Sequence, residues 1–247
     1  MTSAAAVVRG PGRAVLYDPA LVAEPGPDLM PQLAAAAGSP PESARRGRGQ
    51  VLWIEQSGAC WVLRHYRRGG WVGRWIDDRY AWLGEERTRS FREWRMLARL
   101  HSIGLPVPRP VAAGWDRQGW CYRADLVTTA IPEAAPLSDR LAARDAIDWR
   151  GIGETLARFH AAGACHADLN AHNILVDAEG KTWLLDFDRG RFRAPGAWQA
   201  RNLARLERSL RKIAAEPGMP DFSAPGWAEL QAAYREAADL RLRPRGP

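Results

Sequence analysis

Cysteine, lysine and long apolar runs are all scarce in this sequence of 247 residues. Cys60, Cys121 and Cys165 are too few and too widely spaced for a disulfide framework or a zinc pattern, and they fit a reducing compartment. No stretch approaches the roughly 20 apolar residues that a membrane-spanning helix needs. The first residues lack the charged and apolar regions of a cleaved signal peptide. We therefore expect a globular protein that neither spans a membrane nor is exported.

Lysine is almost absent from a strongly basic chain. Only Lys181 and Lys212 stand among 35 basic residues, and the net charge is +7. A field of this sign attracts anions such as nucleic acid, acidic lipid headgroups or a phosphorylated substrate, and charge alone does not choose among them. An apolar share of 46% with 12 tryptophans is typical of a packed protein and argues against disorder.

The first half of the chain is rich in strand patterns and the second half in helical ones. β-branched and aromatic residues predict strands, whereas apolar residues that recur every three or four positions predict helices. The expected strands cover 50–55, 60–66, 120–129, 174–176 and 182–187, and the expected helices cover 87–100, 149–162, 198–213 and 227–240. Pro132 and Pro136 interrupt the pattern between the two halves, so we expect a linker there.

One segment carries a recognisable chemical pattern. The residues from His166 to Asn173 read H-x-D-L-x-x-x-N, and an Asp-Phe-Asp turn begins 13 residues later at Asp186. The first is the pattern of a kinase catalytic loop, and the second resembles the D-F-G metal-binding turn with aspartate in place of glycine. Two short strands between them would form a hairpin that returns the turn to the loop.

Phosphoryl transfer needs these residue types. A carboxylate must orient the attacking hydroxyl and accept its proton, which predicts Asp168 as the catalytic base. Oxygen ligands must hold Mg²⁺ against the nucleotide phosphates, which predicts Asn173 and Asp186 as metal ligands. ATP and Mg²⁺ are the expected cofactors.

These residues allow two other interpretations. Aspartate and asparagine are common in turns, so any one of them alone is more often structural. Alternatively, His160, His166, Asp168 and His172 would bind the metal of a hydrolase. That second interpretation leaves the turn at Asp186 without a role, so the kinase interpretation is favoured.

Three runs also resemble a known family: LRHYRRGG at 63–70, HADLNAHNIL at 166–175 and LDFDRG at 185–190. They are similar to the 3-deoxy-D-manno-octulosonic acid (Kdo) kinases of lipopolysaccharide assembly, and the resemblance extends from about Leu16 to Leu240. It implies transfer of the γ-phosphate of ATP to the 4-hydroxyl of Kdo on the Kdo-lipid A precursor. It also implies a peripheral protein on the cytoplasmic side of the inner membrane.

The expected fold is α+β and protein-kinase-like, with two lobes and the active site in the cleft between them. Residues 1–130 would form a strand-rich N-lobe that covers the nucleotide and carries a basic aromatic insert at 67–89. Residues 131–247 would form a helical C-lobe with the catalytic loop and the metal-binding turn.

The nucleotide side departs from the general kinase pattern. Of a glycine-rich loop only Gly47 and Gly49 remain, with Leu52 where a third glycine would fall, and a plain linker is the alternative. Position and strand pattern place Arg64 in the role of the usual strand lysine, with Glu93 as its helix partner. Arginine grips phosphate bidentately and is not equivalent to lysine. A solvated surface charge is the other interpretation of Glu93.

The insert at 67–89 is rich in both arginine and aromatic residues. At helical spacing, one side would carry Trp71, Val72, Trp75, Ile76, Tyr80 and Leu83. Interfacial helices combine such a side with cationic flanks, so we expect docking on an anionic membrane surface or a phosphorylated headgroup. Packing of the aromatic side against the strand lobe is the alternative.

The acceptor is expected to be a sugar or small hydroxyl compound. No A-P-E sequence and no long activation segment follow Asp186, so we expect no protein substrate. A heptose or aminoglycoside kinase shares the loop motifs and remains an alternative, as does a catalytically silent kinase-like regulator. Nucleic-acid binding would account for the charge but not for the acidic residues, so no nucleic acid is expected.

Overall fold

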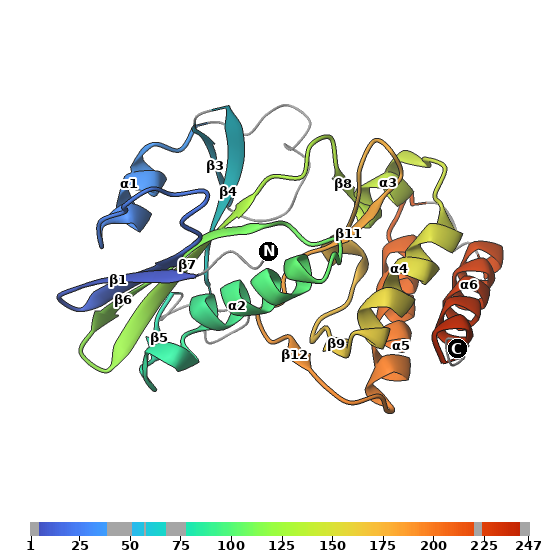
Figure 1. Ribbon diagram of the computed structural model, residues 1–247. Helices are drawn as coiled ribbons and strands as arrows, with labels where there is room; N and C mark the ends of the chain where they lie inside the picture. Colours follow the sequence, from blue (N-terminus) through green and yellow to red (C-terminus); the bar gives the residue numbers. More distant parts are fainter. Residues whose placement is uncertain (1–4, 39–50, 57, 68–77, 220–223, 243–247) are drawn as a thin grey trace. The chain divides into compact units, whose positions relative to one another are not determined.

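A computed structural model of the chain describes every residue except 1–4, 39–50, 57, 68–77, 220–223 and 243–247 (Figure 1). The chain divides into two compact units. The first comprises Met1–Ile103 and Pro108–Ile131, and the second comprises Gly104–Val107 and Pro132–Pro247. A large sheet dominates the first unit and helices dominate the second, which confirms the predicted α+β class.

The first unit is built on one antiparallel sheet. Its 7 strands follow the order β1-β2-β6-β7-β4-β3, and β5 pairs with β7. The strands are β1 Ala6–Gly10, β2 Arg13–Tyr17, β3 Val51–Gln56, β4 Ala59–His65, β5 Tyr80–Ala81, β6 Pro110–Gln118 and β7 Cys121–Thr129. The predicted hairpin of 50–55 and 60–66 is confirmed as β3 and β4, with each of the four strand ends displaced by one residue.

Helices α1, Leu29–Ala35, and α2, Arg89–Ser102, cover opposite faces of this sheet (Figure 1). Side chains alternate between faces along a strand. On β7, Val127 therefore joins the apolar core beneath α1, while the Tyr122 hydroxyl accepts a hydrogen bond of 3.1 Å from the first amide of α2. The same alternation on β4 directs Arg64 toward the α2 face.

Helix α2 buries the predicted stripe. Phe91, Trp94, Leu97 and Leu100 are each at most 3% exposed. The helix begins two residues later than predicted, because Thr88 is extended and a 3₁₀ turn, η3, at Glu85–Arg87 precedes it.

The predicted helix through the basic aromatic insert is wrong at its C-terminal end. Tyr80 lies in strand β5, paired with Tyr122, and the two rings are 5.7 Å apart. The Arg89 guanidinium also lies 4.7 Å from the Tyr80 ring centre. Leu83, which was predicted on the same apolar side, is 67% exposed. Strand pairing and ring packing thus override the helical spacing here, while Trp71 to Ile76 lie outside the described residues.

The second unit consists mainly of helices. They are α3 Leu137–Ala143, α4 Trp149–Ala161, α5 Trp198–Ala214 and α6 Ala224–Leu242. Two small sheets, β11-β10-β8 and β12-β9, accompany them. The short elements are β8 Ala135–Pro136, β9 Ala164–Cys165, η4 Ala171–Asn173, β10 Ile174–Val176, β11 Thr182–Leu184 and β12 Arg191–Phe192. The predicted strand 182–187 ends at Leu184, because the chain turns after it.

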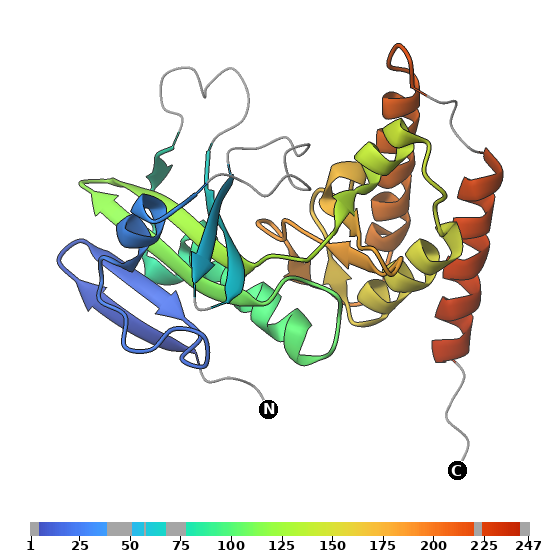
Figure 2. The ribbon, with the colours of Figure 1, turned by 90° about the horizontal axis from the view of Figure 1, so that it is seen from above.

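Helices α4 and α6 lie side by side (Figure 2). Gly153 allows this approach, because a Cβ there would collide with the main-chain carbonyl of Leu230. The ring of His160, near the end of α4, is 3% exposed, and its Nδ1 lies 2.9 Å from the Tyr234 hydroxyl of α6. Burial lowers the pKa of His160 to about 4.

This buried histidine predicts a loss of stability in acid. Because its folded pKa lies below the ordinary value of 6.5, the unfolded chain takes up the proton first as the pH falls. The stability that the neutral His160 ring gives the folded state is fully present above about pH 6.5 and is lost toward pH 4. The unfolding free energy changes by roughly 3 kcal/mol across this range. Urea unfolding of the wild type and His160→Gln should show a stability difference that shrinks through this window. A difference that is independent of pH would contradict the assignment.

Candidate active site

The segment from His166 to Asn173 forms a loop that is held by hydrogen bonds between the His166 ring and main-chain groups. It begins directly after β9 and ends in the 3₁₀ turn η4. The Asp168 amide donates to His166 Nδ1 at 3.0 Å, and His166 Nε2 donates to the Leu185 carbonyl at 2.7 Å. Both ring nitrogens are therefore used, which requires the neutral tautomer protonated at Nε2.

Burial lowers the pKa of His166, in keeping with that neutral form. The Leu185 carbonyl and the carboxylates of Asp186 and Asp168 act in the opposite direction, so both carboxylates lie near this ring. His166 also packs against Phe187 at 4.7 Å, and Phe187 stacks on Phe159 at 5.8 Å. The histidine of the motif thus supports the loop from beneath.

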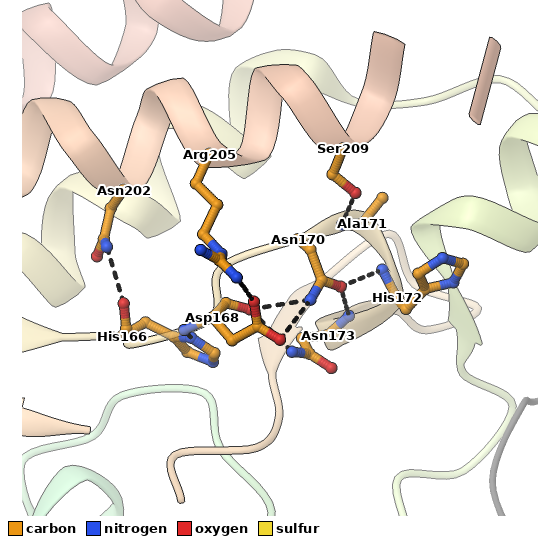
Figure 3. A network of polar contacts seen from close by, with 9 residues as sticks. All are labelled: His166, Asp168, Asn170, Ala171, His172, Asn173, Asn202, Arg205 and Ser209. Atoms are coloured by element: carbon orange, nitrogen blue, oxygen red, sulfur yellow. Dashed lines mark hydrogen bonds and ion pairs between the residues drawn. The ribbon is translucent and has the colours of Figure 1, made fainter. Parts of the chain in front are cut away.

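The Asp168 carboxylate, by contrast, is 52% exposed and oriented by two neighbours (Figure 3). Arg205 Nε of α5 donates to Oδ1 at 2.7 Å, and a terminal nitrogen of the same guanidinium also contacts Oδ1. Asn170 Nδ2 donates to Oδ2 at 3.2 Å. An accessible and oriented carboxylate is what a base that receives the proton of a hydroxyl requires.

Asn170 and Asn173 complete the loop. The Asn170 Oδ1 caps the following turn by accepting from the amides of His172 at 2.9 Å and Asn173 at 3.2 Å. Asn173 Nδ2 donates to the Asp168 carbonyl at 2.9 Å. This bond fixes the amide, so its oxygen Oδ1 points away from that carbonyl.

Asp186 is held next to Asn173 by the main chain. The amide of Leu185 donates to the Asn173 carbonyl at 2.9 Å, so the turn begins beside the loop from His166 to Asn173. Asp186 has a φ of 61°. Few residues other than glycine adopt this left-handed conformation, although aspartate does so more readily than most. Such strain is characteristic of functional turns.

The side-chain oxygens of Asp186 and Asn173 fit a magnesium ion. Mg²⁺ prefers oxygen ligands and is held by one or two carboxylates together with water and substrate phosphates. A carboxylate at Asp186 and an amide oxygen at Asn173, on segments joined through Leu185, supply that set.

The alternative of a metal hydrolase is not supported. Within the described part of the chain, no group of three or more histidine, cysteine or acidic side chains could hold a metal ion. His160 is engaged by Tyr234, and both nitrogens of His166 are engaged in the loop.

In the first unit, the structure brings Arg64 and Glu93 together. The Glu93 carboxylate is 1% exposed and accepts from Arg64 Nη2 and from the Tyr66 hydroxyl, each at 2.5 Å. The Arg64 guanidinium also lies 4.8 Å from the Tyr66 ring centre. Glu93 is therefore not a solvated surface charge. The other predicted nucleotide contacts, Gly47 and Gly49, lie outside the described residues.

Sequence reasoning missed the residues of α5 that hold the loop. Asn202 Nδ2 donates to the His166 carbonyl at 2.8 Å, and the Ala171 amide donates to Ser209 Oγ at 3.2 Å. Together with Arg205 they reach from the helix to the loop (Figure 3). A signal was present, because Asn202 interrupts an otherwise apolar stripe with Trp198 and Leu206.

No helix in the described part of the chain is long and apolar enough to cross a membrane.

Comparison with known proteins identifies the family. Residues 33–234 match the model of the lipopolysaccharide kinase (Kdo/WaaP) family. A 3-deoxy-D-manno-octulosonic acid kinase of Stenotrophomonas maltophilia (strain K279a) is 47% identical over 190 residues, which cover 76% of each chain. The enzyme of the same name from Xylella fastidiosa (strain M12) is 47% identical over 197 residues, or 79% of this chain and 75% of that one.

Among solved structures, the bifunctional kinase-methyltransferase WbdD superposes with a TM-score of 0.45 and 20% identity. The match covers 80% of this chain and 44% of that one. The family match extends over most of both units. The chain therefore belongs to the lipopolysaccharide kinase (Kdo/WaaP) family and is a phosphotransferase, as the loop from His166 to Asn173 predicted.

Proposed function

We propose that this enzyme transfers the γ-phosphate of ATP to the 4-hydroxyl of Kdo on the Kdo-lipid A precursor. The exposed Asp168 carboxylate, held between Arg205 and Asn170, is the observation that carries the proposal. The names of the relatives, all 3-deoxy-D-manno-octulosonic acid kinases, support the acceptor.

In this proposal the acceptor hydroxyl donates a hydrogen bond to Asp168, which orients it for in-line attack on the γ-phosphorus of ATP. Asp168 takes the proton as the new oxygen–phosphorus bond forms and the bond between the γ-phosphorus and the bridging oxygen breaks, so that ADP leaves. The neutral His166 does not compete for that proton, since both its nitrogens are engaged. Asn173 and Asp186 would hold Mg²⁺, which when bound supplies positive charge to the nucleotide phosphates.

Arg64 is proposed to contact the nucleotide phosphates, with Glu93 holding its guanidinium in place. The pair has the strand and helix positions expected for that role, with arginine in place of the usual lysine, and arginine can present two parallel donors to a phosphate. Gly47 and Gly49 are proposed to lie over the phosphates on sequence grounds alone.

We also propose that the enzyme acts as a peripheral protein on the cytoplasmic side of the inner membrane. The acceptor is a glycolipid, so its sugar would be reached at an anionic surface. The tryptophans at 71 and 75 would contribute the contact. Trp82, in the C-terminal part of the insert, supports packing of the insert against the strand lobe instead, because the Trp82 ring lies 4.5 Å from the ring of Trp115. Flotation with anionic vesicles tests the proposal. Unchanged binding by Trp71→Ala/Trp75→Ala would show that the insert does not contribute to membrane binding.

The transfer assay uses the purified chain, γ-labelled ATP and Mg²⁺ with one acceptor at a time: Kdo-lipid A precursor, a heptose-bearing glycolipid or an aminoglycoside. Label is expected in the Kdo lipid, at the 4-hydroxyl by NMR, and should disappear with a chelator and return with added Mg²⁺. Label in another acceptor would replace the proposed substrate. Nucleotide binding without transfer to any acceptor would favour a regulator.

A further inference from the structure

Helix α5 carries a stripe of four basic residues, Arg201, Arg205, Arg208 and Lys212, which we call the α5 stripe. Their spacing of four, three and four residues places them on one side of the helix, and all four are exposed. At 1.5 Å per residue the stripe is about 16 Å long.

The α5 stripe runs beside the catalytic loop. Asn202 and Ser209 lie next to the stripe, both on the same side of it, and bind the loop main chain at His166 and Ala171. Arg205 itself reaches the Asp168 carboxylate (Figure 3). An anion bound along the stripe would therefore lie next to the proposed base.

Most of the charge on the α5 stripe is uncompensated. Across the residues that the structure describes, no acidic side chain lies within ion-pair distance of Arg201, Arg208 or Lys212. Arg211, about 120° round the helix from Arg205, instead pairs with Glu207 at 2.8 Å. A solvated basic face needs no function, but this one contacts the proposed base through Arg205.

Arg205 is the member that distinguishes a binding surface from a merely basic one. Its Nε and one terminal nitrogen both contact a single oxygen of Asp168. A guanidinium has five N–H donors, so the outer edge of Arg205 still offers donors to a second carboxylate. The residue is 47% exposed, so a ligand can reach that edge.

We infer that the α5 stripe binds the carboxylate of an acidic-sugar acceptor, with Arg205 bridging that carboxylate and Asp168. This inference rests on the proposed function, because the acceptor it names is the acid sugar of that proposal. Arg205 is then a positioning residue for Asp168 and a specificity residue for the acceptor. Arg201 and Arg208, on either side, add the field that attracts the acid.

The test compares the Kdo glycolipid with a matched acceptor whose carboxylate is reduced to an alcohol. Arg201→Ala/Arg208→Ala is expected to raise the KM for the acid acceptor about 10-fold, equivalent to 1.4 kcal/mol, with the KM for ATP unchanged. The variant should not change the KM for the reduced acceptor. Arg205→Ala should lower kcat/KM more for the acid than for the reduced acceptor, and Arg205→Lys should recover part of that loss. Arg211→Ala, on the same helix, is the matched control.

Equal losses with the acid and the reduced acceptor would overturn the carboxylate assignment, as would an effect that disappears when only the lipid phosphates are removed. Titration of the free acid sugar against wild type and Arg201→Ala/Arg208→Ala gives a readout without turnover, and equal affinities would also overturn it. Failure of the wild type to phosphorylate the glycolipid would instead count against the proposed function.

Discussion

Asp168→Asn is expected to lower kcat by about 10²- to 10⁴-fold, the usual contribution of a positioned general base. Asparagine keeps the size of the side chain and can still accept from Arg205 through its amide oxygen, but it cannot take the proton of the acceptor hydroxyl. The loop itself should persist, because the Asp168 main chain makes the contacts to His166 and Asn173. Steady-state transfer kinetics with the Kdo glycolipid measure the effect.

Asp145→Asn is a suitable control for that variant. Asp145 lies in the same unit, is similarly exposed at 44%, and also faces an arginine, Arg140, at 3.7 Å. It should leave kcat unchanged. The base assignment would fail if Asp168→Asn retained more than a tenth of wild-type kcat while nucleotide affinity and thermal stability were normal.

Arg64→Met should reduce both stability and activity, for two separable reasons. The buried Glu93 carboxylate would lose this cation and keep the hydrogen bond from the Tyr66 hydroxyl. Removing one member of a buried ion pair costs about 3 kcal/mol, taken at the lower end because Arg64 is 27% exposed. Loss of a phosphate-binding cation should in addition lower kcat/KM for ATP on the order of 100-fold.

A second substitution separates the two roles of Arg64. In Arg64→Met/Glu93→Gln neither position carries a charge, and the Tyr66 hydroxyl can still donate to the glutamine oxygen. Unfolding free energy should therefore recover most of its loss, whereas kcat/KM for ATP should not. Recovery of activity together with stability would show that Arg64 acts only through the fold. Arg64→Lys should keep part of the activity, since it keeps the charge but loses the bidentate geometry.

The conformation of the loop from His166 to Asn173 was predictable because its information is local. Asp168 and Asn173 lie five positions apart on one loop, and Asp186 returns through a hairpin of two short strands whose apolar residues are visible in the sequence. The contact between Arg64 and Glu93 was predictable for a related reason, because Arg64 lies on a predicted strand and Glu93 on the predicted helix that follows it.

The contact between Arg205 and Asp168 was not predictable in this way. The two residues are 37 positions apart, and the register of α5 against the loop is set by tertiary packing. The sequence shows only that one side of the helix is basic. Likewise, strand β5 is two residues long, so its pairing with β7 leaves no periodic signal, and helical spacing prevailed in the prediction.

Leu185 joins the loop and the turn at Asp186 without using its side chain. Its amide donates to Asn173 and its carbonyl accepts from His166. Any residue with an N–H can make both bonds, so natural variation at this position should be broad, with proline excluded. A comparison of side chains across relatives would overlook a position of this kind. The half-buried side chain also offers a place for a fluorescent amino acid, which would test whether the nucleotide binds beside this turn while the main-chain bonds stay intact.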